Sequence, residues 1–210
     1  MATSSRRVGA ETSKTRDTLL DCVEKMMLED GYASVTYRAL AARAGVTPSL
    51  VQYYFPTLDD VFIAAIRRYS ERNLAYLDKV MQKRVEDPLR ALWEYSWDEA
   101  TGTLMTEFMA LGNHRKSIRT EIAAVTESVR TLQLDALVAR FGEDARPWGD
   151  LSLPALQLLI SSLPKFLNLE KGVGVETAHA ELVDAFEGYL ASIEPTSGPK
   201  RKPSARKRSR

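Results

Sequence analysis

Apolar residues recur along most of the chain at intervals of three and four positions, which is the spacing of one face of an α-helix. The pattern is clearest in Ile118, Ile122, Val125, Val129 and Leu132. Alternating runs of β-branched residues, which would indicate strands, are absent from the sequence. The pattern therefore predicts an all-α protein.

Capping residues mark the expected helix boundaries in the first third of the chain. Thr36, Thr47 and Thr57 each precede an apolar periodic segment, and a threonine hydroxyl can accept a hydrogen bond from an unpaired amide at a helix start. Pro48 fits the first turn of a helix, where its missing N–H has no cost. The expected helices are 13–30, 36–44, 47–55, a long helix from 57, and then 89–97, 102–113, 118–141, 153–169 and 175–193.

Charge is distributed unevenly along the 210 residues. The whole chain carries +1 and residues 197–210 carry +7 without an acid, so the preceding residues carry −6. Segregation of this kind often accompanies binding to polyanions. Residues 1–12 and 195–210 are expected to be a disordered basic arm and a disordered basic tail, because neither can bury apolar area.

Several classes of protein are disfavoured. The single cysteine, Cys22, and the two histidines, His114 and His179, provide neither a disulfide framework nor metal-ligand spacing. The uncharged segment 151–164 is shorter than the ~20 residues of a membrane span. No phosphate-binding glycine loop or nucleophile motif indicates an enzyme. We expect a cytoplasmic protein that is not an enzyme, has no membrane span and requires neither a metal nor another cofactor.

The most informative segment is TYRALAARAGVTPSLVQYYF, residues 36–55. Two short helices joined by a turn that contains Gly45 describe a helix-turn-helix, whose second helix enters the major groove of DNA. The spacing directs Leu40 and Val51 toward a shared core and leaves Gln52 and Tyr53 outward. Such helix pairs also occur in helical proteins that never bind DNA, so the pattern alone leaves both interpretations open.

The segments GYASVT at 31–36, LAARAGVT at 40–47 and YYFPTLDDVF at 53–62 resemble the DNA-binding domain of the TetR family of bacterial transcriptional regulators. The resemblance implies an all-helical homodimer that binds double-stranded DNA, with a C-terminal domain for a small molecule and dimerisation through the last two helices. Two positions depart from the family pattern: Gln52 replaces a tyrosine and Leu58 replaces a lysine that contacts phosphate. The DNA-contacting positions carried over from the family are Thr36, Tyr37, Arg38, Thr47, Pro48, Ser49, Gln52 and Tyr53.

The resemblance ends near Tyr69, and beyond it the sequence offers only candidates for ligand binding. Aromatic and methionine side chains concentrate on the middle helices and suit the lining of a site for a small apolar ligand. The competing interpretation is that they belong to the core or, for the polar member, to a helix end. The candidates are Trp93, Trp97, Met105, Phe108, Met109 and Asn113.

The implied architecture has a helix-turn-helix DNA-binding domain at 13–58 and a helical regulatory and dimerisation domain at 59–194. Apolar stripes around Leu156 and Leu163 and around Leu182 and Tyr189 either pack inside one subunit or pair with a second copy. The principal hypothesis is a ligand-responsive regulator, in particular a repressor, that binds a palindromic operator as a homodimer. The alternative is an architectural DNA-binding protein that depends on its basic tail and has little sequence preference.

Overall fold

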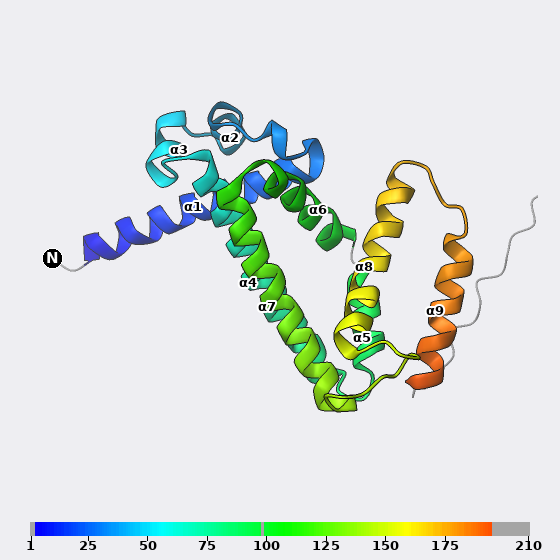
Figure 1. The fold of residues 1–210 in the computed structure, drawn as a ribbon. Helices are drawn as coiled ribbons and strands as arrows, with labels where there is room; N and C mark the ends of the chain where they lie inside the picture. The colour runs from blue at the N-terminus through cyan, green and yellow to red at the C-terminus, as the bar shows by residue number, and fades with distance from the viewer. Residues whose placement is uncertain (1–2, 98, 195–210) are drawn as a thin grey trace, which may run out of the picture.

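The computed structural model describes residues 3–97 and 99–194, and these form α-helices joined by short turns, with no β-strand among them (Figure 1). The all-α prediction is confirmed. None of the helices in this part of the chain is both long and apolar enough to cross a membrane. The helices are α1 Thr3–Asp30, α2 Tyr37–Ala44, α3 Pro48–Tyr54, α4 Leu58–Lys83, α5 Pro88–Ser96, α6 Glu99–His114, α7 Lys116–Phe141, α8 Leu153–Gly172 and α9 His179–Ile193, with a short 3₁₀ turn at Tyr32–Ser34.

Two helix starts differ from the prediction by four residues or more. Helix α1 begins at Thr3 and not at residue 13, so residues 3–12 are helical and not a disordered arm. Helix propagation from the packed part of α1 adds one hydrogen bond for each residue, and no proline interrupts it. Helix α9 begins at His179 and not at 175, because Gly174 and Ala178 adopt left-handed backbone conformations. The predicted tail, 195–210, lies outside the described residues.

A first core joins α1–α4 to α6 and the start of α7. The predicted caps form: the Thr36 hydroxyl accepts from the Ala39 amide, and Thr57 and Asp60 make a reciprocal capping box. Val35 and Leu40 are both buried, as expected for a hydrophobic staple at the start of α2. The core also includes Phe108 of α6, so the helix-turn-helix packs against a helix far away in the sequence.

A second core holds the far half of α4 with α5, α7, α8 and α9. Trp93 stacks on Phe186, with 4.5 Å between their ring centroids. Glu194 is buried, and its two carboxylate oxygens accept the Leu89 and Arg90 amides at the start of α5, at 3.0 and 2.8 Å. Burial raises the pKa of Glu194, while the two amide donors oppose that rise. The end of α9 is thereby fixed to the start of α5.

Helices α4 and α7 lie side by side and connect the two cores (Figure 1). Arg67 donates two hydrogen bonds of 2.8 Å to the Glu121 carboxylate across this pair. At the upper end, Asp59 accepts from Arg115 and Ser117 at the start of α7. These hydrogen bonds hold the pKa of Asp59 below its ordinary value. The turn between α6 and α7 is therefore attached to the first turn of α4.

Replacing Gly45 tests the backbone geometry of the turn between α2 and α3. Gly45 has a φ of 67°, and an added Cβ would meet nothing within 4 Å, so strain alone decides the result. We expect Gly45→Ala to lower the free energy of unfolding by about 1–2 kcal/mol, measured by urea denaturation. Gly45→Asn is the control, because asparagine tolerates this conformation, and it should recover much of the loss. Equal stability of the alanine variant and the parent protein would refute this explanation of the turn.

Candidate nucleic-acid interface and adjoining cavity

The orientation of α3 is fixed by its buried side. Val51 is fully buried and Phe55, which follows the helix, is nearly so. Thr47 caps the helix by accepting the Leu50 amide, and Pro48 occupies the first turn as predicted. The Val46 amide donates to the Ala41 carbonyl across the turn, at 3.0 Å. A helix of seven residues is therefore held on both ends and on one face.

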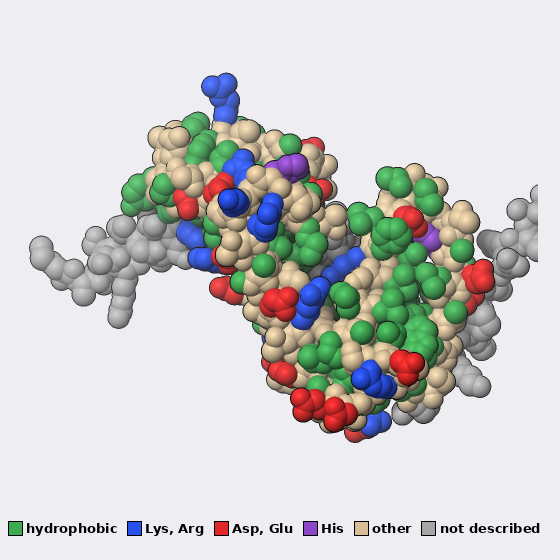
Figure 2. Space-filling model, in the orientation of Figure 1, with side chains coloured by type: hydrophobic (Ala, Val, Ile, Leu, Met, Phe, Trp, Pro, Cys, Tyr) green, Lys and Arg blue, Asp and Glu red, His purple; other side chains and the backbone are tan. Residues whose placement is uncertain are grey.

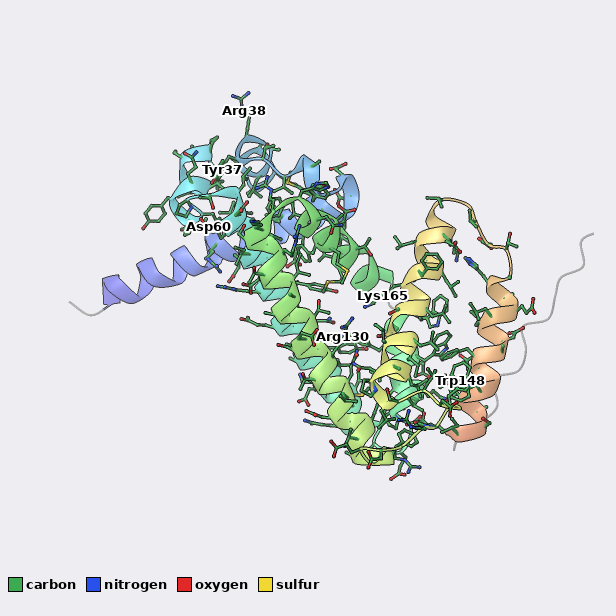
Figure 3. The ribbon with its side chains drawn as sticks, in the orientation of Figure 1. Tyr37, Arg38, Asp60, Arg130, Trp148 and Lys165 are labelled. Atoms are coloured by element: carbon green, nitrogen blue, oxygen red, sulfur yellow. The ribbon has the colours of Figure 1, made fainter. Side chains whose placement is uncertain are left out.

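The opposite side of α3 faces solvent. Ser49, Gln52 and Tyr53 are exposed, and the Tyr53 side chain is 75% exposed. Most of the expected contact residues are exposed to solvent, and Arg38 projects from α2 away from the body (Figure 3). The exposed members of the expected set are Thr36, Arg38, Thr47, Pro48, Ser49, Gln52 and Tyr53.

Tyr37 differs from the other expected contact residues because it is half-buried. Its hydroxyl donates to the Phe55 carbonyl at 2.9 Å, which connects the start of α2 to the end of α3. Desolvation, with a smaller contribution from Asp60, raises the pKa of the Tyr37 phenol. The sequence did not reveal this internal role, because the position of Phe55 depends on the tertiary packing.

The positive charge of Arg43 is compensated in the folded chain, which changes the charge balance expected for residues 31–58. Counting along residues 31–58 leaves Arg38 and Arg43 without an acid, yet in the folded chain Arg43 pairs with Glu29 and Asp30 at the end of α1. The hydrogen bond that Arg43 donates to the Glu29 carboxylate raises the pKa of Arg43. Within the part of the chain that the structure describes, Arg38 has no ion-pair partner. The favourable positive charge of this surface therefore rests on Arg38.

A cavity of about 310 Å³ lies among α4, α5, α6, α7 and α8. Two residues of the expected ligand-binding set, Met105 and Met109, line it, and Tyr95 joins them. Its lining residues are Tyr69, Asn73, Tyr95, Met105, Thr106, Met109, Thr126, Val129, Arg130, Gln133, Leu158, Ser161, Ser162, Lys165, Phe166 and Leu169.

Four of the six predicted ligand residues lie elsewhere. Trp93 and Phe108 are buried in the second and first cores, where aromatic packing holds them. Trp97 faces a separate surface groove between α4 and α5, and Asn113 is exposed near the end of α6. Aromatic content therefore identified core positions as well as cavity positions. Aromatic content did not identify Lys165, which also lines the cavity. The feature of the sequence that could have identified Lys165 is its position as a cation within the apolar pattern of 153–169.

Comparison with known proteins agrees with this arrangement. Residues 19–65 match the family model described as bacterial regulatory proteins, tetR family. The chain is 27% identical over 137 residues to the HTH-type transcriptional regulator AcrR of Shigella flexneri, an alignment that spans 63% of each chain. It is 26% identical over 180 residues to the HTH-type transcriptional repressor BepR of Brucella suis biovar 1, covering 78% of this chain and 83% of that one.

The fold is also that of solved regulators. The reduced form of E. coli NemR superposes with a TM-score of 0.66 at 18% identity, covering 88% of this chain and 100% of that chain. The matched segment contains the core of the helix-turn-helix, from Leu19 on α1 to Ala65 on α4. The helix-turn-helix formed by α2 and α3 therefore lies in a segment that matches the TetR family of bacterial transcriptional regulators, and the chain is similar to HTH-type transcriptional regulators over most of its length.

Proposed function

We propose that this protein is a ligand-responsive repressor that binds a palindromic operator as a homodimer. The observation that carries the proposal is the exposed face of α3, held rigidly by Val51 and Phe55. Residues 13–58 act as the DNA-binding domain and residues 59–194 as the regulatory and dimerisation domain. The central experiment is selection and sequencing of DNA fragments that the purified protein retains, which should yield a palindrome.

The chemistry of this face suits contacts in the major groove. The Gln52 amide can donate and accept simultaneously, which matches the N6 and N7 atoms of adenine. Tyr53 can reach a phosphate or the methyl group of thymine. Ser49 and Thr47 already share a contact of 3.0 Å between their hydroxyl oxygens, and each retains capacity to bind a phosphate.

Gln52→Ala tests direct base contact. We expect the variant to lose about 1–3 kcal/mol of binding free energy on the selected operator and to relax specificity at one base position. Fluorescence anisotropy with the operator and with scrambled DNA measures both effects. Equal losses on the two DNAs would show that Gln52 does not contribute to base recognition.

Arg38→Ala and Arg43→Ala form a matched pair, because both arginines lie on α2 but differ in their charged neighbours. Arg43 is neutralised by Glu29 and Asp30, whereas Arg38 is exposed without an ion-pair partner among the described residues. We expect Arg38→Ala to weaken operator binding about tenfold or more and Arg43→Ala to have a smaller effect. Titrations at several salt concentrations provide the measurement. A larger loss for Arg43→Ala would contradict this assignment of the DNA-facing charge.

An apolar surface on α8 and α9 supports dimerisation. Of the predicted stripes, Leu156, Ile160, Phe186 and Leu190 are buried within the subunit, where they fill the second core. Other apolar residues of these helices remain exposed, and apolar side chains gather over α8 and α9 in Figure 2. Exposed patches of this kind often mark protein interfaces. The exposed members are Leu158, Phe166, Leu169 and Leu182.

Leu182→Glu tests the dimer, because Leu182 lies on α9 and is 41% exposed. A carboxylate buried at a two-fold interface would lack a partner, so we expect the dimer dissociation constant to rise at least tenfold. Sedimentation velocity over a range of concentrations measures this change. Val85→Glu is the control, since Val85 is also exposed but lies between α4 and α5. Dissociation by both variants, or by neither, would argue against this interface.

Helix α6 offers a physical connection between ligand and DNA. One face presents Met105 and Met109 to the cavity, and the other buries Phe108 in the first core. Its Glu107 carboxylate accepts the Tyr32 amide at 2.9 Å, just before α2. A ligand that binds one position of α6 better than another would therefore shift the orientation of the helix-turn-helix.

A further inference from the structure

The cavity combines apolar walls with concentrated positive charge. Tyr69, Tyr95, Met105, Met109 and Phe166 supply aromatic and thioether surface. Arg130 and Lys165 are its only charged lining residues, and no carboxylate is found among the described residues that line it. An apolar ligand would offer a counter-charge to neither cation. The chemistry of the walls therefore differs from the site for a small apolar ligand that the sequence predicts.

Of the two cations, Lys165 is the one whose charge is not compensated by a carboxylate among the described residues. It lies on α8 and points into the space between α7 and α8, where Arg130 approaches it from α7 (Figure 3). Within the described residues, its ammonium has no ion-pair partner, whereas Arg130 lies 3.6 Å from the exposed Glu127 carboxylate. Burial and, to a smaller extent, the charge of Arg130 lower the pKa of Lys165.

A third polar group in the same wall is unsatisfied. The Thr126 Oγ1 atom is buried and has no hydrogen-bond partner among the described residues. Thr126 precedes Arg130 by four residues on α7, so the two side chains share one helix face. A buried hydroxyl without a hydrogen-bond partner is destabilising, because its desolvation is not compensated. A hydrogen-bond acceptor on a ligand would remove this unfavourable free energy.

We propose that the cavity binds a small organic carboxylate with an apolar tail, and that Lys165, Arg130 and Thr126 bind its head group. The ammonium and guanidinium donate to the carboxylate oxygens, and the Thr126 hydroxyl supplies a further donor. The tail lies against Met105, Met109 and the tyrosine rings. Charge-assisted hydrogen bonds are roughly twice as strong as neutral ones, so the head group dominates the choice of ligand. The role of this binding in DNA release rests on the proposed function, but the binding itself does not.

Three probes of equal chain length separate charge from hydrophobicity: decanoate, decanamide and decylammonium. Isothermal titration calorimetry with the full-length protein measures each affinity without DNA. We expect decanoate to bind at least about tenfold more tightly than decanamide, and decylammonium to bind more weakly than both. Tighter binding of the amide or the amine, or no binding of any probe, would overturn the proposal.

Lys165→Met removes the charge and keeps the length and apolar character of the side chain, so folding should be preserved. We expect it to abolish the preference for decanoate over decanamide while leaving decanamide affinity within about twofold. Arg130→Gln should reduce the preference partially. Lys79→Met is the matched control, because Lys79 is exposed on α4 and does not line the cavity. An unchanged preference in Lys165→Met would overturn the role of Lys165.

A separate titration of the protein bound to its selected DNA distinguishes the two proposals. Release of DNA by decanoate from the parent protein but not from Lys165→Met would support both. Tight, Lys165-dependent binding of decanoate without any change in DNA affinity would support the anion site and contradict the ligand-responsive function. Release by decanamide as effective as release by decanoate would support ligand response and overturn the carboxylate preference.

Discussion

The seven-residue helix α3 depends on burial in a core that it does not build alone. An isolated helix of this length is unstable in water, because nucleation fixes several dihedral angles before hydrogen bonds compensate. Val51 and Phe55 attach α3 to the first core, and that core is completed by Leu104, Phe108 and Leu111 of α6. The exposed face of α3 is therefore held rigidly only as long as α6 remains packed in the same core. This shared packing is the constraint from which the rest of the molecule's behaviour follows.

The same shared packing connects the cavity to the helix-turn-helix, because α6 contributes to both. Packed cores do not deform continuously, so a displaced α6 must either keep its interdigitation with the first core or shift to another discrete arrangement. Glu107 adds a directional contact, since its carboxylate holds the Tyr32 amide at the entrance to α2. Arg115 and Ser117, just beyond α6, hold Asp59 in the first turn of α4. A change at the cavity therefore reaches the helix-turn-helix through two attachments, one before α2 and one after α3.

Local chemistry made much of the fold predictable. The caps at Thr36, Thr47 and Thr57 and the left-handed glycine at 45 depend on neighbours within a few residues, so the boundaries of α2, α3 and α4 follow from sequence. The pairing of Arg43 with Glu29 and the buried location of Trp93 depend on which helices meet, and periodicity does not encode that choice. The exposed face of α3 was predictable because it depends on spacing within one short helix. The cavity depends on how five helices meet, and it was predictable only in its two methionines.

Charge inside the cavity connects binding to conformation. Lys165 and Arg130 repel each other and Lys165 is poorly hydrated, and both effects oppose the close approach of α7 and α8. The proposed anion would attract both cations and compensate for the lost hydration of Lys165, so its affinity would be higher for the arrangement that brings the two cations together. A ligand shifts an equilibrium only by such a difference in affinity. In the proposed anion site, the unfavourable energy of the Lys165 charge without a counter-ion is what would allow a small carboxylate to favour one arrangement over another.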